Sequence, residues 1–116
     1  MASRPTKLVT LFNEADEDAW VLNREFEDSM ILGPAVIAPF EAVTFEDITI
    51  SGSLDAALIE IPTGKTLQGV IGLRHVTFRR CWLMDIAIIG PPGIIAECRE
   101  ALQVLPSELV SSTPVA

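Results

Sequence analysis

Few residues of this chain combine the type and the spacing that catalysis or metal binding needs. The only histidine, His75, follows Arg74, and no carboxylate stands at a spacing that would orient it as a base. We therefore interpret His75 as a surface residue and not as a catalytic base. Cys81 and Cys98 form no CxxC pair, and with a single histidine they do not support a zinc site. We expect both thiols to be buried as small apolar side chains.

Two further groups of residues have some features of ligand sites. The acidic run Asp16-Glu-Asp18 lacks the glycine and the regular alternation of an EF-hand loop, so it predicts a solvated loop. Gly64-Lys-Thr66 ends like a phosphate-binding loop but lacks the upstream glycine, so it predicts a turn. The sequence therefore assigns no catalytic residue, no metal ligand and no cofactor.

The strongest pattern in the chain is a five-residue repeat of apolar triplets. Each triplet has an apolar residue, a variable one and a large apolar one, and two mostly polar or small residues follow it. This period fits neither the 3.6 of an α-helix nor the 2 of a plain strand. It is typical of short strands separated by regular bends, as in a β-solenoid. The triplets are Ala38-Pro-Phe40, Val43-Thr-Phe45 and Ile48-Thr-Ile50 in a first block, and Ile71-Gly-Leu73, Val76-Thr-Phe78, Cys81-Trp-Leu83 and Ile86-Ala-Ile88 in a second.

The two blocks match each other at an offset of 33 or 34 residues, with Val43-Thr-Phe45 aligned on Val76-Thr-Phe78. We predict that they lie side by side as neighbouring rows, with residues 51–67 as an excursion between them. Opposite charges would then face each other on the outer surface and fix the register. The predicted charge pairs are Glu41 with Arg74, Glu46 with Arg79, and Asp47 with Arg80. The predicted inward side chains are Phe40, Phe45, Ile50, Leu73, Phe78, Leu83 and Ile88.

Residues 38–50 and 71–88 resemble the pentapeptide-repeat proteins. That resemblance implies a right-handed β-helix in which Ala38 and Cys81 take the small first inward position. Bulkier residues such as Val43 and Val76 at the same position favour the wider coils of general right-handed parallel β-helices. A competing six-residue register resembles the left-handed β-helix acyltransferases. It joins Ile31, Ile37, Val43 and Thr49, and then Val70, Val76, Trp82 and Ile88.

The remaining segments give the domain organisation. After Gly90-Pro-Pro-Gly93 the apolar period changes to 3.6, which predicts an amphipathic helix over 93–105 that ends at Pro106. We predict a single, mainly β domain over 1–116. Its parts are N-terminal strands and an acidic loop (8–29), a repetitive β region (30–89), the C-terminal helix, and a tail (107–116).

The composition of the chain disfavours some classes of binding partner. The net charge of −8 disfavours nucleic acid and anionic membrane surfaces, which both select basic proteins. No apolar stretch is long enough to span a bilayer, and with no visible signal peptide we expect a cytoplasmic protein. A mean hydropathy of +0.41 is high for a soluble domain, so we expect a homo-oligomer.

These observations favour a non-catalytic oligomeric structural or protein-interaction module. One alternative is an acidic surface-mimic regulator or inhibitor of a DNA-processing enzyme, because some pentapeptide-repeat proteins imitate DNA. The other is a β-helix enzyme, either an acyltransferase or a carbohydrate-active one. The candidate interaction residues are Trp82, Arg74, Arg79, Arg80, Ile94, Ile95, Cys98 and Leu102.

Overall fold

One sheet of eight parallel strands forms the body of the protein, so the predicted mainly β class is confirmed. The computed structural model describes residues 5–62 and 68–105. The strand order is β2-β6-β3-β7-β4-β8, with β1 added to β3 and β5 added to β7. The strands are β1 (Lys7–Thr10), β2 (Trp20–Glu27), β3 (Ser29–Glu46), β4 (Ile48–Ile50), β5 (Leu58–Glu60), β6 (Ile71–Arg79), β7 (Trp82–Gly90) and β8 (Leu102–Val104).

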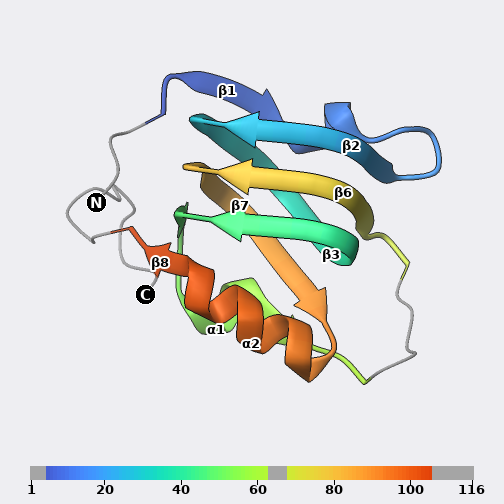
Figure 1. Cartoon of the computed structure of the whole chain (residues 1–116), viewed down its shortest axis with the longest axis vertical. Coiled ribbons are helices and arrows are strands. Elements are labelled where there is room, and N and C mark those ends of the chain that lie inside the picture. Colours follow the sequence, from blue (N-terminus) through green and yellow to red (C-terminus); the bar gives the residue numbers. More distant parts are fainter. Residues whose placement is uncertain (1–4, 63–67, 106–116) are drawn as a thin grey trace.

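The long strand β3 belongs to two parts of this sheet. Its first half pairs with β1 and β7, and its second half, from Ile37 onward, pairs with β6. In Figure 1, β2, β6 and the second half of β3 lie side by side in one layer, and β7 crosses behind them. A short 3-10 helix, η1 (Leu11–Glu14), follows β1, and two α-helices, α1 (Leu54–Ala57) and α2 (Pro92–Ala101), lie at the opposite end.

The strands bend at the spacing that the repeat predicts. Residues with positive φ, which turn the backbone sharply, recur five positions apart within each row. Several of them are Asn or Asp, whose side chains tolerate this conformation better than most. They are Asn23 and Asp28 in the first row, Ala42 and Asp47 in the next, and His75, Arg80 and Asp85 in the last.

The two repetitive blocks are neighbours, as predicted, with Val43 opposite Val76 and Phe45 opposite Phe78. A third row, which the sequence analysis did not align, lies on the other side of β6, where Phe26 is opposite Phe78. The order in space therefore differs from the order along the chain, because residues 71–79 are inserted between 20–27 and 37–46.

The core lies along the inward positions of these rows. Of the seven predicted inward side chains, Phe45 is half-buried and five others are buried: Ile50, Leu73, Phe78, Leu83 and Ile88. The prediction for Phe40 is wrong, since its side chain is 56% exposed. The register shifts between Pro39 and Glu41, and this bulge leaves Phe40 without a partner on β6 and places its ring against Trp20, with 5.1 Å between centroids.

The predicted C-terminal helix is too long at its end. Helix α2 ends at Ala101, and the next three residues form β8 beside β4, with Leu102 opposite Ile48. Pairing with β4 satisfies their backbone groups, and the Leu105 N–H donates to the carbonyl of Ile50. The tail and the Gly64-Lys-Thr66 turn fall outside the described residues. Within the described part of the chain, no helix has the length and the apolar character needed to cross a bilayer.

Candidate functional site

Three equivalent tripeptides lie side by side across the layer formed by β2, β6 and β3. Phe26-Glu-Asp28 and Phe45-Glu-Asp47 flank Phe78-Arg-Arg80, so that an acidic row lies on each side of a basic one. In each tripeptide the third residue has positive φ and forms the bend. We call these the first acidic row, the basic row and the second acidic row.

The three phenylalanine rings form a stacked column. Phe26 and Phe78 lie 5.3 Å apart between ring centroids, and Phe45 and Phe78 lie 5.4 Å apart, with the planes within 15° and 6° of parallel. Stacking of this kind adds about 0.5–1.5 kcal/mol per pair beyond the apolar area that is buried. The central ring, Phe78, is fully buried.

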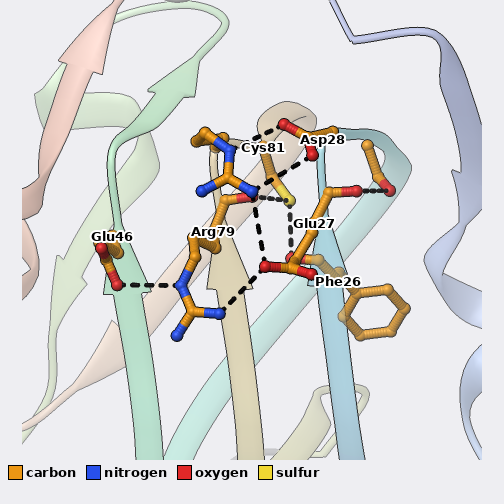
Figure 2. A network of polar contacts seen from close by, with 8 residues as sticks. Phe26, Glu27, Asp28, Glu46, Arg79 and Cys81 are labelled. Carbon is orange, nitrogen blue, oxygen red and sulfur yellow. Dashed lines mark hydrogen bonds and ion pairs between the residues drawn. The ribbon is translucent and has the colours of Figure 1, made fainter.

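Five charged residues of the rows form a network of polar contacts (Figure 2): Glu27, Asp28, Glu46, Arg79 and Arg80. Arg79 donates to Glu46 through Nε and to Glu27 through Nη1, both at 3.1 Å, and so joins the two acidic rows. Arg80 makes a bidentate contact with Asp28, at 2.8 Å from Nε to Oδ1 and 3.2 Å from Nη2 to Oδ2. These charge-assisted bonds agree with the register in which the rows pair through their backbones.

The network also changes the titration of its members. The hydrogen bond from Arg80 holds the pKa of Asp28 below its ordinary value, because it favours the ionised carboxylate. The hydrogen bonds to Glu27 and Glu46 raise the pKa of Arg79, which stays charged. Both arginines are therefore fixed cations that neutralise the acids around them.

The predicted charge pairs are confirmed in two cases of three. Glu46 pairs with Arg79, and Glu41 lies 3.8 Å from Arg74. The third prediction is wrong, because Arg80 turns to Asp28 of the first acidic row. As a result, Asp47 makes no ion pair with any residue that the structure describes.

The first acidic row is covered by the chain itself. The guanidinium carbon of Arg24 lies over the Phe26 ring, 5.0 Å from its centroid, and Arg24 forms a salt bridge with Glu14 of η1. Phe26 is only 3% exposed and belongs to the main hydrophobic core. Arg24 occupies the register position that Val76 has on the neighbouring row, and its side chain is 45% exposed.

The second acidic row faces a groove instead. Among described residues, the stretch from Ala38 to Glu46 pairs with β6 alone, so its other side is a free strand edge. Phe45 is half-buried, and a groove of about 360 Å³ runs between this edge and α2. The charged side chains that line the groove are both acidic, Glu41 and Glu97. The groove is lined by Pro39, Phe40, Glu41, Ala42, Val43, Thr44, Phe45, Ile94, Glu97, Cys98 and Ala101.

The structure separates the predicted interaction residues into different places. The candidate interaction residue Trp82 is buried: it is 7% exposed and packs with Met30 and Leu105 between β3 and β4. Its indole N–H has no partner among the described residues. Ile95 and Leu102 are covered by the sheet.

The other predicted residues lie in three places. Arg74 is exposed, with its guanidinium carbon 4.8 Å from the ring centroid of Trp20. Ile94 and Cys98 line the groove, while Arg79 and Arg80 belong to the network. Two of the predicted interaction residues, Ile94 and Cys98, therefore belong to the helical wall of the groove.

Among the described residues, the side chains that could act as a base or a nucleophile include His75, Cys81 and Cys98. His75 is exposed, 3.7 Å from Glu41 at a bend, and does not line the groove. The thiol of Cys81 is buried and donates to the carbonyl of Phe26 at 3.2 Å, and burial raises its pKa. Burial, and secondly the charge of Glu97, raise the pKa of Cys98 to about 11, which disfavours a thiolate nucleophile. Within residues 5–62 and 68–105, no cluster of His, Cys, Asp and Glu could hold a metal ion.

Sequence reasoning missed the first acidic row, although a signal for it was present. The tripeptide Phe-Glu-Asp occurs twice, at 26–28 and at 45–47. The row escaped the repeat because Arg24 replaces the apolar residue that begins each triplet. The chain matches no protein-family profile, no curated protein and no solved structure.

Proposed function

We propose that the protein is a non-catalytic protein-interaction module that binds through the outer edge of β3 and the groove against α2. The occupant is an extended, basic segment of another protein. We also propose that the bent sheet is a short right-handed β-helix whose last turn is the second acidic row. The observation that supports the function is the contrast between the two Phe-Glu-Asp rows, of which one is covered by Arg24 and the other faces a groove.

Strand addition is the binding mode that suits this edge. A free strand edge offers unpaired backbone N–H and C=O groups, which give affinity to any extended peptide. The side chains beside the edge then give specificity. Here the apolar positions are Val43 and Phe45, and the apolar residues of α2 form the opposite wall.

The charge of the groove selects the occupant. Glu41 and Glu97 line it, and the exposed Glu46 and Asp47 continue the acidic surface at the end of the strand. No basic side chain is among the residues that line the groove. An acidic surface attracts and orients a basic partner and rejects an acidic one.

A second copy of this chain is a poor occupant of the same edge. Symmetric antiparallel pairing about Val43 and Thr44 would place Glu41 of one copy against Glu46 of the other. Head-to-tail stacking would place the second acidic row against the first acidic row of the next copy. Like charges in directly opposed positions destabilise a strand pair, so the acids at both ends of the column limit self-stacking.

The two alternative functions have less support. The arginines of the basic row neutralise the middle of the acidic surface, which breaks the continuous stripe that a mimic of DNA would need. A carbohydrate-active enzyme would use two carboxylates in one groove, and Glu41 and Glu97 do line it. However, the side chain of Glu41 is 58% exposed and contacts Arg74, whereas a glycosidase acid lies in an apolar, sheltered position.

A peptide-display selection tests the proposal. A library of ten-residue extended peptides is selected on the wild-type protein, on a groove variant that carries Asp47→Arg and Glu97→Lys, and on a control variant. The control carries Glu25→Arg and Glu100→Lys, which change charge equally on exposed positions of β2 and α2 outside the groove. We expect basic peptides to be enriched on the wild type and the control and lost on the groove variant.

Two results would contradict the proposal. Equal enrichment on all three proteins, or none on any, would remove the edge of β3 as a binding surface. Light scattering of the wild type over a concentration series supplies the other test. A dimer that the groove variant abolishes and the control retains would make a second copy the occupant.

A further inference from the structure

We infer that the partner segment runs parallel to β3 and repeats the pattern of the protein's own basic row, with apolar residues two apart followed directly by two arginines or lysines. This inference rests on the proposed function and names the chemistry of the partner at the same edge. In the basic row the pattern is Val76-Thr-Phe78 followed by Arg79 and Arg80.

The structure shows how a basic row fits an acidic one on each of its two sides. On one side of β6, Phe78 is opposite Phe26 and Arg79 is opposite Glu27. On the other side, Phe78 is opposite Phe45 and Arg79 is opposite Glu46. The same strand therefore pairs in parallel, in the same register, with both Phe-Glu-Asp rows.

A fourth row outside β3 would repeat the contact that β6 makes with β2. Its inner side would correspond to the side of β6 that faces the first acidic row. Across that contact Arg80 binds Asp28 at 2.8 Å, and Arg79 binds Glu27 at 3.1 Å. The equivalent acids on the open side are Asp47 and Glu46.

Asp47 is the acid that this arrangement leaves for a partner. It occupies the same bend position as Asp28, with φ of 55° against 52°. Asp28 has the bidentate arginine, whereas Asp47 makes no ion pair with a described residue. The second basic side chain of the partner's pattern, which corresponds to Arg80, would form an ion pair with Asp47 as Arg80 does with Asp28.

The apolar part of the pattern fits the column in the same way. The aromatic residue of the partner would stack on Phe45, whose other side is stacked on Phe78. The apolar residue of the partner that corresponds to Val76 would lie beside Val43 in the groove, which Ile94 also lines. The occupant must come from another protein, because in a folded copy β6 is already paired on both sides.

A peptide with the sequence of residues 71–80 is the direct probe. Its binding to the full-length protein is measured by fluorescence anisotropy, beside a scrambled peptide and a peptide that carries Arg79→Glu and Arg80→Glu. We expect saturable binding of the native sequence only, weakened at higher ionic strength. In the protein, Asp47→Arg should weaken binding at least ~10-fold, and the matched Glu25→Arg should change it less than ~2-fold.

Backbone amide shifts in NMR spectra locate the peptide. Shifts concentrated in residues 41–47 are expected. Shifts concentrated on β2, or equal binding of the scrambled or glutamate peptide, would overturn the inference. If the native peptide does not bind while the display selection yields peptides that are lost on the groove variant, the pattern is wrong and the interaction module stands. If neither binds, both proposals fail.

Discussion

The two Phe-Glu-Asp rows have the same sequence and the same neighbour, yet they have different surroundings. In the first acidic row, Phe26 is 3% exposed under Arg24, and Asp28 is held by Arg80. In the second acidic row, Phe45 is half-buried beside a groove, and Asp47 has no ion pair with a described residue. The comparison shows that rows of identical sequence can differ in what covers them: Arg24, paired with Glu14, lies over the ring of the first row, whereas the equivalent position beside the second row is Val43.

Removal of the rings should give the largest difference between the ends. Phe26→Ala creates a cavity in a covered part of the core and should reduce the free energy of unfolding by about 3–5 kcal/mol. Phe45→Ala removes a half-buried ring and should cost about 1–2 kcal/mol, because less apolar surface is lost from the interior. Urea unfolding followed by tryptophan fluorescence measures both.

The paired comparison has its own control. Leu22→Ala removes an exposed apolar side chain from the same strand as Phe26 and should change the free energy of unfolding by less than ~0.5 kcal/mol. Equal losses for Phe26→Ala and Phe45→Ala would mean that the groove does not leave the second ring less covered than the first.

The five-residue repeat predicted the local features of the fold but not the order of its rows. The five-residue period is a local pattern, so it predicted the bends, the inward positions from Leu73 to Ile88 and the contact of Phe45 with Phe78. It did not predict that residues 71–79 lie between 20–27 and 37–46, because this order is a long-range property that only a comparison of three rows can reveal.

The errors have local physical causes. The bulge beside Phe40 moves this ring out of the predicted column. Trp82 is drawn inside because its neighbours across the sheet, Met30 and Thr49, are themselves buried. The groove depends on where α2 packs, and packing of a helix against a sheet edge leaves no periodic signal in the sequence.

An exchange of the residues that distinguish the two ends tests the role of Arg24 directly. Val43 is opposite Val76 on one side of β6, and Arg24 is opposite it on the other, so the two occupy equivalent positions. Val43→Arg should let the new guanidinium cover Phe45 and compete with the arginines of the peptide, lowering peptide affinity at least ~10-fold. Anisotropy with the peptide of residues 71–80 measures this.

The reciprocal variant, Arg24→Val, should affect the stability of the protein and not its affinity for the peptide. It removes the cation from the Phe26 ring and the salt bridge to Glu14, and it should lower the free energy of unfolding by about 0.5–1 kcal/mol without changing peptide affinity at the β3 edge. Undiminished peptide binding by Val43→Arg would show that the open end is not the counterpart of the closed one.

The smallest expected difference is in the dependence of stability on pH. The hydrogen bond from Arg80 holds the pKa of Asp28 below its ordinary value of 3.8 in the folded protein. A carboxyl group whose pKa is lower in the folded state contributes stability above its unfolded pKa, and loses that contribution as the pH falls through its folded pKa. Asp28→Asn should therefore reduce stability at neutral pH and flatten the loss of stability as the pH falls below the ordinary carboxyl pKa of 3.8. Asp47→Asn changes the equivalent bend residue of the open end. It should leave the free energy of unfolding and its dependence on pH close to those of the wild type, because no basic side chain among the described residues pairs with Asp47.

Urea unfolding at a series of pH values measures the pH dependence of both variants. A slope that Asp47→Asn flattens as much as Asp28→Asn would mean that the open acidic row already has a cation bound within this chain, and it would leave no acid at the bend for a partner to neutralise.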